Sequence, residues 1–170
     1  MLRRTRALLI GVLLALASST PAMAAAPQVE ATLDGRPIDL DEVGRYQCHD
    51  LDYPVIRCFR KAVDRDLSID LDLGVLDASV SVSVAASVVY VTLYDGQNLT
   101  GSSISLSQDY DALATIGWND RASSFMGRNG ETGRLYLDWF HGGSSTAFCC
   151  NQVFRTLSGY DNAYSSAYRT

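Results

Sequence analysis

The sequence is poor in the residues on which most catalytic and zinc centres depend. It has two histidines, His49 and His141, in different segments, and its four cysteines contain no Cys-x-x-Cys spacing, so a zinc site is not expected. There is no Gly-x-Ser-x-Gly motif, and neither histidine has a paired acid or serine in a recognised arrangement. The sequence therefore predicts that the protein is not an enzyme.

A long apolar run is also missing. Residues 1–24 have a basic start at Arg3, Arg4 and Arg6, a short apolar stretch and a small-residue cleavage signal that ends at Ala24. This order is typical of a cleaved secretory signal peptide, and the apolar stretch is too short to span a bilayer. We therefore expect a secreted, extracellular chain with no membrane span after leader cleavage.

Basic residues are scarce in the remainder. The leader contains three of the 14 basic residues and none of the 19 acidic ones, so its removal leaves 11 basic against 19 acidic residues and changes the net charge from −5 to −8. Such a chain is not expected to bind nucleic acid or an anionic membrane surface, whereas it is compatible with binding cations.

The four cysteines, Cys48, Cys58, Cys149 and Cys150, all lie in the exported part, where disulfides persist. Four cysteines allow three pairings. Cys48 and Cys58 flank two short extended pieces around a turn at residues 52–54, which favours a local disulfide, while the other pairings stay open. Adjacent cysteines in a strand point to opposite faces, so Cys149 and Cys150 are not expected to cross-link to one element.

Residues 25–87 predict a small β-rich N-terminal segment and a linker. Two short strands joined through Asp34-Gly35 are expected in residues 29–40. From Leu67 to Val84 apolar residues largely alternate with polar ones, which predicts half-buried strands rather than a helix. The run "DASVSVSVAAS" is also compatible with an extended linker, and we place the boundary near Ser87.

Residues 88–170 contain an internal repeat. Sliding the chain by 42 residues places "WNDRASS", which starts at Trp118, on "YDNAYSS", which starts at Tyr160, without a gap. Each copy, about 88–129 and about 130–170, reads as four short strands. The repeat predicts an all-β fold in which two Greek keys form a β-sandwich, because pairing the copies covers the apolar sheet face of each.

The repeated polar motifs resemble those of the βγ-crystallin superfamily. "WNDRASS" follows Tyr94 and Gly101, and "YDNAYSS" follows Tyr136 and Gly143. The Greek-key landmarks and the pattern Asn/Asp-Asn/Asp-x-x-Ser/Thr-Ser thus occur twice, in order. The resemblance covers residues 88–170, and it implies a βγ-crystallin-like sandwich with two calcium sites.

In that family each calcium ion is shared between the two motifs. The first site would take the carbonyl of Arg121 and the hydroxyl of Ser123 together with the side chain of Asp161 or Asn162. Calcium accepts carbonyl, hydroxyl and carboxylate oxygens in a flexible shell of six to eight ligands. The small number of carboxylates implies weak binding.

The reciprocal site would be built in the same way from the other motif. Its ligands would be the carbonyl of Ala163, the hydroxyl of Ser165 and the side chain of Asn119 or Asp120. Each site would also take a main-chain carbonyl from one of two hairpins, Asp95–Asn98 and Leu137–Phe140.

We therefore expect a secreted calcium-binding module with a structural or binding role, with an envelope component as one candidate partner. The alternative is a secreted metalloproteinase inhibitor with a crystallin-like fold, which would insert residues 126–133 or the turn between Cys48 and Cys58 into an extracellular protease. A third hypothesis is a carbohydrate surface formed by four aromatic residues, although core packing is the favoured interpretation of these residues: Trp118, Trp139, Phe140 and Tyr160.

Overall fold

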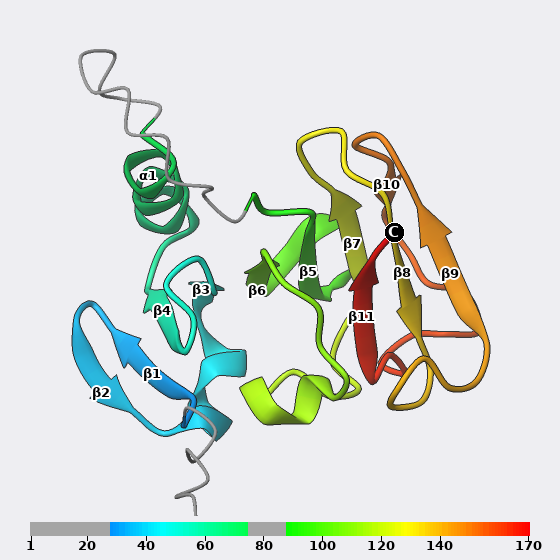
Figure 1. The fold of residues 1–170 in the computed structure, drawn as a ribbon, viewed down its shortest axis with the longest axis horizontal. Coiled ribbons are helices and arrows are strands. Elements are labelled where there is room, and N and C mark those ends of the chain that lie inside the picture. Colours follow the sequence, from blue (N-terminus) through cyan, green and yellow to red (C-terminus); the bar gives the residue numbers. More distant parts are fainter. Residues whose placement is uncertain (1–27, 75–87) are drawn as a thin grey trace, which may run out of the picture.

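The computed structural model describes residues 28–74 and 88–170 (Figure 1). The predicted signal peptide and most of the predicted linker lie outside these residues. The N-terminal part contains β1 (Glu30–Leu33), β2 (Arg36–Ile38), the short 3-10 helix η1 (Leu40–Arg45), β3 (Gln47–His49), β4 (Val55–Phe59) and α1 (Ala62–Asp72). The repeat contains β5 (Val91–Gly96), η2 (Gln97–Leu99), β6 (Thr100–Leu106), η3 (Leu113–Ile116), β7 (Ser124–Gly127), β8 (Gly133–Tyr136), β9 (Ser145–Phe148), β10 (Val153–Phe154) and β11 (Ser166–Arg169).

The two copies of the repeat form sheets with the same register. In the first copy β5 lies between β6 and β7, and in the second copy β8 lies between β9 and β11. Leu93 faces Ile104 on β6, and Leu135 faces Thr146 on β9, so adding 42 to the first pair gives the second. The sequence offset is therefore a structural pseudo-symmetry.

Each copy also contributes residues to the sheet of the other. Strand β10, from the second copy, pairs antiparallel with β7 of the first. In return, Tyr110 of the first copy forms an antiparallel bridge with Ala167 on β11. This exchange confirms the prediction of two Greek keys in one β-sandwich, because neither copy completes its own sheet. The expectation of four strands per copy holds for the second copy, whereas the described first copy has three strands and the single bridge at Tyr110.

The core lies between the two sheets. Phe125 and Trp118 are fully buried, and Phe125 stacks on Phe154 with ring centroids 4.3 Å apart. Burial of one such side chain contributes about 1.5–3 kcal/mol. Core packing is thus the correct interpretation for Trp118, but it is wrong for Trp139 and Phe140, which are 52% and 68% exposed. Both belong to the turn that joins β8 to β9, where no second sheet covers them.

The N-terminal segment extends the first sheet of the repeat. Strand β3 runs parallel to β6, with Cys48 beside Ile104, and the eight strands follow the order β10-β7-β5-β6-β3-β4-β1-β2. The expected β1–β2 hairpin is present, and its turn residues Asp34 and Gly35 have positive φ angles of 48° and 79°, as tight hairpins require. The segment therefore packs directly on the repeat.

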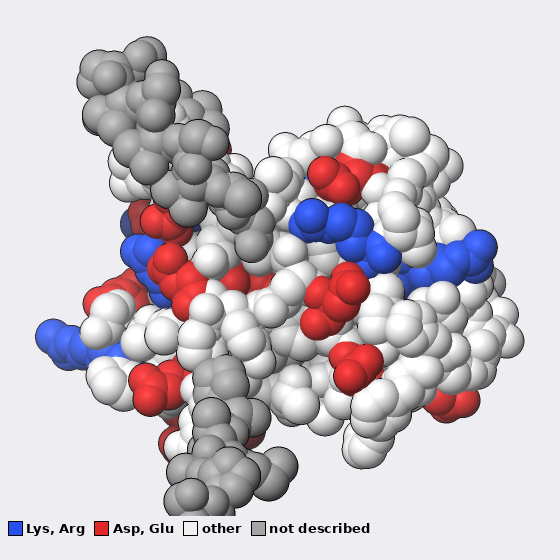
Figure 2. All heavy atoms as spheres, viewed as in Figure 1, with Lys and Arg blue, Asp and Glu red and all other residues white. Residues whose placement is uncertain are grey.

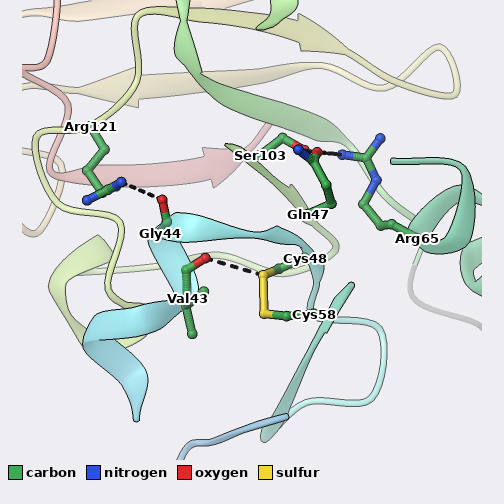
Figure 3. Close-up of a disulfide and its surroundings, with 8 residues drawn as sticks. All are labelled: Val43, Gly44, Gln47, Cys48, Cys58, Arg65, Ser103 and Arg121. Atoms are coloured by element: carbon green, nitrogen blue, oxygen red, sulfur yellow. Dashed lines mark hydrogen bonds between the residues drawn. A yellow bond between two sulfur atoms is a disulfide. The ribbon is translucent and has the colours of Figure 1, made fainter. Parts of the chain in front are cut away.

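The Cys48–Cys58 disulfide links β3 to β4, where the two residues lie directly opposite each other (Figure 3). Local pairing around the turn thus occurs as the spacing favours. Cys149 and Cys150 are free thiols. They follow the end of β9 in a turn, in which Cys150 has a φ angle of 56°, so the strand geometry considered for them does not apply.

One local prediction is wrong: residues 67–72, expected in a half-buried strand, belong to the helix α1, and residues 75–84 of that expected strand region lie outside the described residues. The alternating leucines that suggest a strand also fit a helix, since Val63, Leu67 and Leu71 recur every four residues. These three side chains are largely exposed, and the helix instead turns Arg65 and Ser68 toward the sheet. The alternation therefore did not mark the buried face. Within the described ranges no helix is long and apolar enough to cross a membrane.

Candidate functional site

The two repeated motifs meet through reciprocal side-chain contacts. The Ser123 hydroxyl donates a hydrogen bond of 3.2 Å to Oδ1 of Asn162, and the Ser165 hydroxyl donates one of 3.1 Å to Oδ1 of Asp120. The offset of 42 relates these two contacts. Of the alternatives left open by the sequence, the second Asn/Asp of each motif is therefore the one that reaches the serine of the other.

The backbone explains why the second position of each motif makes this contact. Asp120 and Asn162 both have a φ angle of 53°, a left-handed conformation that Asn and Asp tolerate better than most residues. The Asp120 amide donates to the Tyr164 carbonyl, and the Asn162 amide donates to the Ala122 carbonyl, both at 3.0 Å. Each motif is thus fixed against the backbone of the other.

The last serine of each motif holds a hairpin in place. The Ser124 hydroxyl donates to the Gly96 carbonyl at 2.6 Å, and the Ser166 hydroxyl donates to the Asp138 carbonyl at 2.7 Å. These carbonyls belong to the two hairpins expected to supply a ligand. The sequence predicts that the hairpins lie near the motifs, but it does not identify the serines that attach them.

The first Asn/Asp of each motif plays a different part. The side chain of Asn119 donates to Oδ2 of Asp120 at 2.6 Å and accepts a hydrogen bond of 3.2 Å from Nε1 of Trp139. It therefore orients Asp120 and attaches the exposed Trp139 to the motif. Asp161 is exposed, and the structure does not bring its side chain to Ser123.

Arg121 links the first motif to the N-terminal segment. Its guanidinium donates to the Gly44 carbonyl of η1, as Figure 3 shows, and lies 3.4 Å from Oδ2 of Asp95. A Cβ atom at position 44 would overlap this guanidinium, so a larger residue there would displace the end of the Arg121 side chain. The Arg121 side chain is therefore used for packing, while its carbonyl accepts no hydrogen bond from the described residues.

The oxygens gathered here fit a calcium ion better than a transition metal. In the described ranges no three His, Cys, Asp or Glu side chains are grouped to hold a metal ion, and the motifs offer hydroxyl, amide, carboxylate and main-chain oxygens. Neighbouring ligands in a calcium shell with bonds of about 2.4 Å lie about 2.8–3.4 Å apart. The Ser123–Asn162 and Ser165–Asp120 oxygen separations of 3.2 and 3.1 Å are those of the hydrogen bonds that join the motifs, and they also allow both oxygens of a pair to contact one ion.

A second polar group, beneath α1, contains histidine, serine and aspartate. Nε2 of His49 lies 3.0 Å from the Ser68 hydroxyl and 3.7 Å from a carboxylate oxygen of Asp72. Nδ1 accepts from the Leu51 amide at 3.4 Å, so Nε2 carries the proton and donates to Ser68. Burial, followed by the charge of Arg57, lowers the pKa of His49 to about 4. A neutral donor of this kind cannot activate the serine as a base, and the group instead attaches α1 to the sheet.

No protein-family model and no curated protein matches the chain. Among solved structures it is similar to a βγ-crystallin domain from Flavobacterium johnsoniae, at 31% identity over 48% of this chain and 93% of that one, with a TM-score of 0.42. It is also similar to a βγ-crystallin from Ciona intestinalis, at 19% identity over 47% of this chain and 98% of that one, with a TM-score of 0.44. An archaeal βγ-crystallin is similar at 24% identity over 48% of this chain and 98% of that one, with a TM-score of 0.41. About half of this chain thus spans nearly the whole of each domain.

Proposed function

The chain belongs to the βγ-crystallin superfamily, and from this premise we propose that residues 88–170 form a non-enzymatic calcium-binding module that acts outside the cell. The observation that carries the proposal is the reciprocal contact between the motifs. Ser123 and Asn162 form one pair of ligand oxygens, and Ser165 and Asp120 form the other. Each pair takes one residue from each Greek key, so an ion bound there holds the two copies together.

The remaining ligands in this proposal are main-chain carbonyls and water. The carbonyls of Arg121 and Ala163 accept no hydrogen bond within the described residues, so they are free to face an ion. The two sites differ in charge, because one contains the carboxylate of Asp120 and the other contains the amide of Asn162. Since affinity for calcium rises with the number of charged ligands, the Asp120 site is the tighter one.

The proposed role of the ion is to stabilise the sandwich. Calcium that binds only the folded chain, at 100 times its dissociation constant, raises the free energy of unfolding by about 2.7 kcal/mol per site. This is a large share of the roughly 5–15 kcal/mol that stabilises an ordinary domain. Calcium in the millimolar range outside the cell would therefore favour the folded, protease-resistant state.

Calcium titration by calorimetry, together with thermal unfolding in calcium and in EDTA, tests the proposal. Wild-type protein should release or absorb heat in two steps and unfold at a higher temperature in calcium. Asp120→Ala should remove the tighter step, whereas the matched variant Asp161→Ala should retain both steps. Absence of heat and of any change in melting temperature at millimolar calcium would refute the function. If both variants lost the same binding step, calcium binding would stand, but the assignment of Asp120 rather than Asp161 as a ligand residue would be refuted.

The inhibitor alternative stays a prediction, as does export of the chain. The two loops considered for protease insertion are the β7–β8 turn and the β3–β4 turn. The described residues show no feature that favours either of them over the calcium module. An inhibition assay against a thermolysin-like protease would test this alternative separately.

A further inference from the structure

The pseudo-symmetry of the repeat is broken at one pair of strand edges. The first sheet continues beyond β6, because β3 pairs with it, whereas the second sheet ends at β9 in the order β11-β8-β9. Strand β9 lies at the right-hand margin of the molecule in Figure 1. The outer edge of β6 is therefore paired with a strand, whereas the equivalent edge of β9 pairs with no strand among the described residues.

The covered edge identifies the groups that accept a new strand. On β6 the Ser103 amide donates to the Tyr46 carbonyl at 3.0 Å, and the Ser105 carbonyl accepts from the Asp50 amide at 3.3 Å. Because β8–β9 has the register of β5–β6 shifted by 42 residues, the equivalent outward groups on β9 are those of Ser145 and Ala147. The main-chain groups of Thr146 and Phe148 face β8 instead.

Strand β9 lacks the features that protect natural edges from pairing. Edge strands usually carry charged residues, proline or a bulge, but residues 139–154 contain no Asp, Glu, Lys, Arg or Pro. Ala147 is exposed. On the face drawn in Figure 2, most atoms along this margin belong to neither acidic nor basic residues, apart from the end of a basic band.

From these observations we propose that β9 pairs antiparallel with β9 of a second copy of this chain, which joins two three-stranded sheets into one. Residues Ser145–Phe148 carry no charge, so no like charges of β9 itself meet across the two-fold axis. The Arg134 side chain beside them comes from β8 and donates to the Ser145 hydroxyl at 3.1 Å. Centring the axis on Thr146 places Ser145 opposite the partner's Ala147. This register uses every outward N–H and C=O of both residues.

Sedimentation velocity over micromolar to millimolar protein tests the pairing. The exported chain would carry Cys149→Ser and Cys150→Ser, which prevent disulfides between chains. A reversible monomer–dimer equilibrium is expected. Ala147→Pro should weaken the dimer at least about tenfold, because proline removes an outward N–H while sparing the bonds to β8. The control Ala147→Thr keeps the N–H and should retain the dimer.

Hydrogen exchange at low and high protein concentration provides a second readout that needs no strand substitution. The Thr146 and Phe148 amides should be protected at both concentrations, because they bond to β8. The Ser145 and Ala147 amides should gain protection only at high concentration. A chain that stays monomeric, a dimer that Ala147→Pro leaves intact, assembly beyond two copies, or no concentration-dependent protection of these two amides would each overturn the proposal.

Discussion

Two neighbouring buried groups, His49 and Asp50, are expected to give opposite pH dependences of stability. Burial raises the pKa of Asp50 from 3.8 to about 6, although hydrogen bonds from Ser107 and Tyr110 oppose that shift. Burial, and then the charge of Arg57, lowers the pKa of His49 from 6.5 to about 4. The folded chain thus favours a protonated Asp50 and a neutral His49.

The two contributions have opposite signs in the same pH window. The Asp50 contribution is fully present below pH 3.8 and is lost as the pH rises through about 6. The His49 contribution is fully present above pH 6.5 and is lost as the pH falls through about 4. At about 1.4 kcal/mol per pKa unit, each is worth about 3 kcal/mol. Between about pH 4 and about pH 6, unfolding releases a proton from Asp50 and binds one to His49, so the two effects on the pH dependence of stability nearly cancel.

Replacing one group should therefore reveal the other. In Asp50→Asn the free energy of unfolding should fall by about 2 kcal/mol relative to wild type as the pH is lowered from about 6 to about 4, because the His49 contribution is then unopposed. In His49→Gln, which keeps a donor toward Ser68, it should rise by about the same amount. Urea unfolding in EDTA at a series of pH values measures both, and subtracting the wild-type curve cancels the other groups.

The matched control is Asp161→Asn, which removes an exposed carboxylate. Its free energy of unfolding at each pH measures the effect of an Asp→Asn change at the surface, and it is compared with the curves of the two buried-site variants. Curves for Asp50→Asn and His49→Gln that run parallel to wild type would show that the buried groups do not titrate as reasoned, and the linkage argument would be wrong.

Two further substitutions test the packing. Replacing Cys48 and Cys58 by alanine opens a loop with a sequence separation of 10 and should cost about 3 kcal/mol in urea unfolding; an unchanged midpoint would contradict that role. Leu135→Ala, at a fully buried position facing β9 and β11, should lower the free energy of unfolding by about 2–5 kcal/mol, and a loss below about 1 kcal/mol would place Leu135 outside the core.

The repeat was readable from the sequence because its information is local and duplicated. A gap-free offset of 42 residues fixes which strands correspond, and turn residues such as Asp34-Gly35 specify their own hairpin. Cys48 and Cys58 are close in sequence, so their pairing needs only one turn. In each case the residues that determine the structure lie within a few positions of one another or recur at a constant distance.

The parts that the sequence did not reveal depend on distant contacts or on backbone conformation. The β3–β6 pairing places Cys48 beside Ile104, although the predicted linker separates them in the sequence. No residue pattern in either strand predicts that it pairs with the other. Helix α1 was missed because its buried face is polar rather than apolar. Asp120 rather than Asn119 contacts the serine of the other motif because Asp120 has a positive φ angle. The sequence does not show which of two adjacent Asn/Asp residues adopts that conformation.

The strand that the N-terminal segment adds to β6 also limits how far copies of this chain can assemble. A duplicated domain whose β6 and β9 edges were both open would have a valence of two, and head-to-tail addition through such edges leads to filaments. Because β3 occupies the β6 edge, only one of these two edges, that of β9, is left to bind another copy. The sheet that β3 enters ends at β2, where Pro37 interrupts the outer edge, as natural edge strands often do. If β9 pairs as proposed, β9 is thus the only one of these two equivalent edges left for pairing, and assembly through this edge stops at two copies.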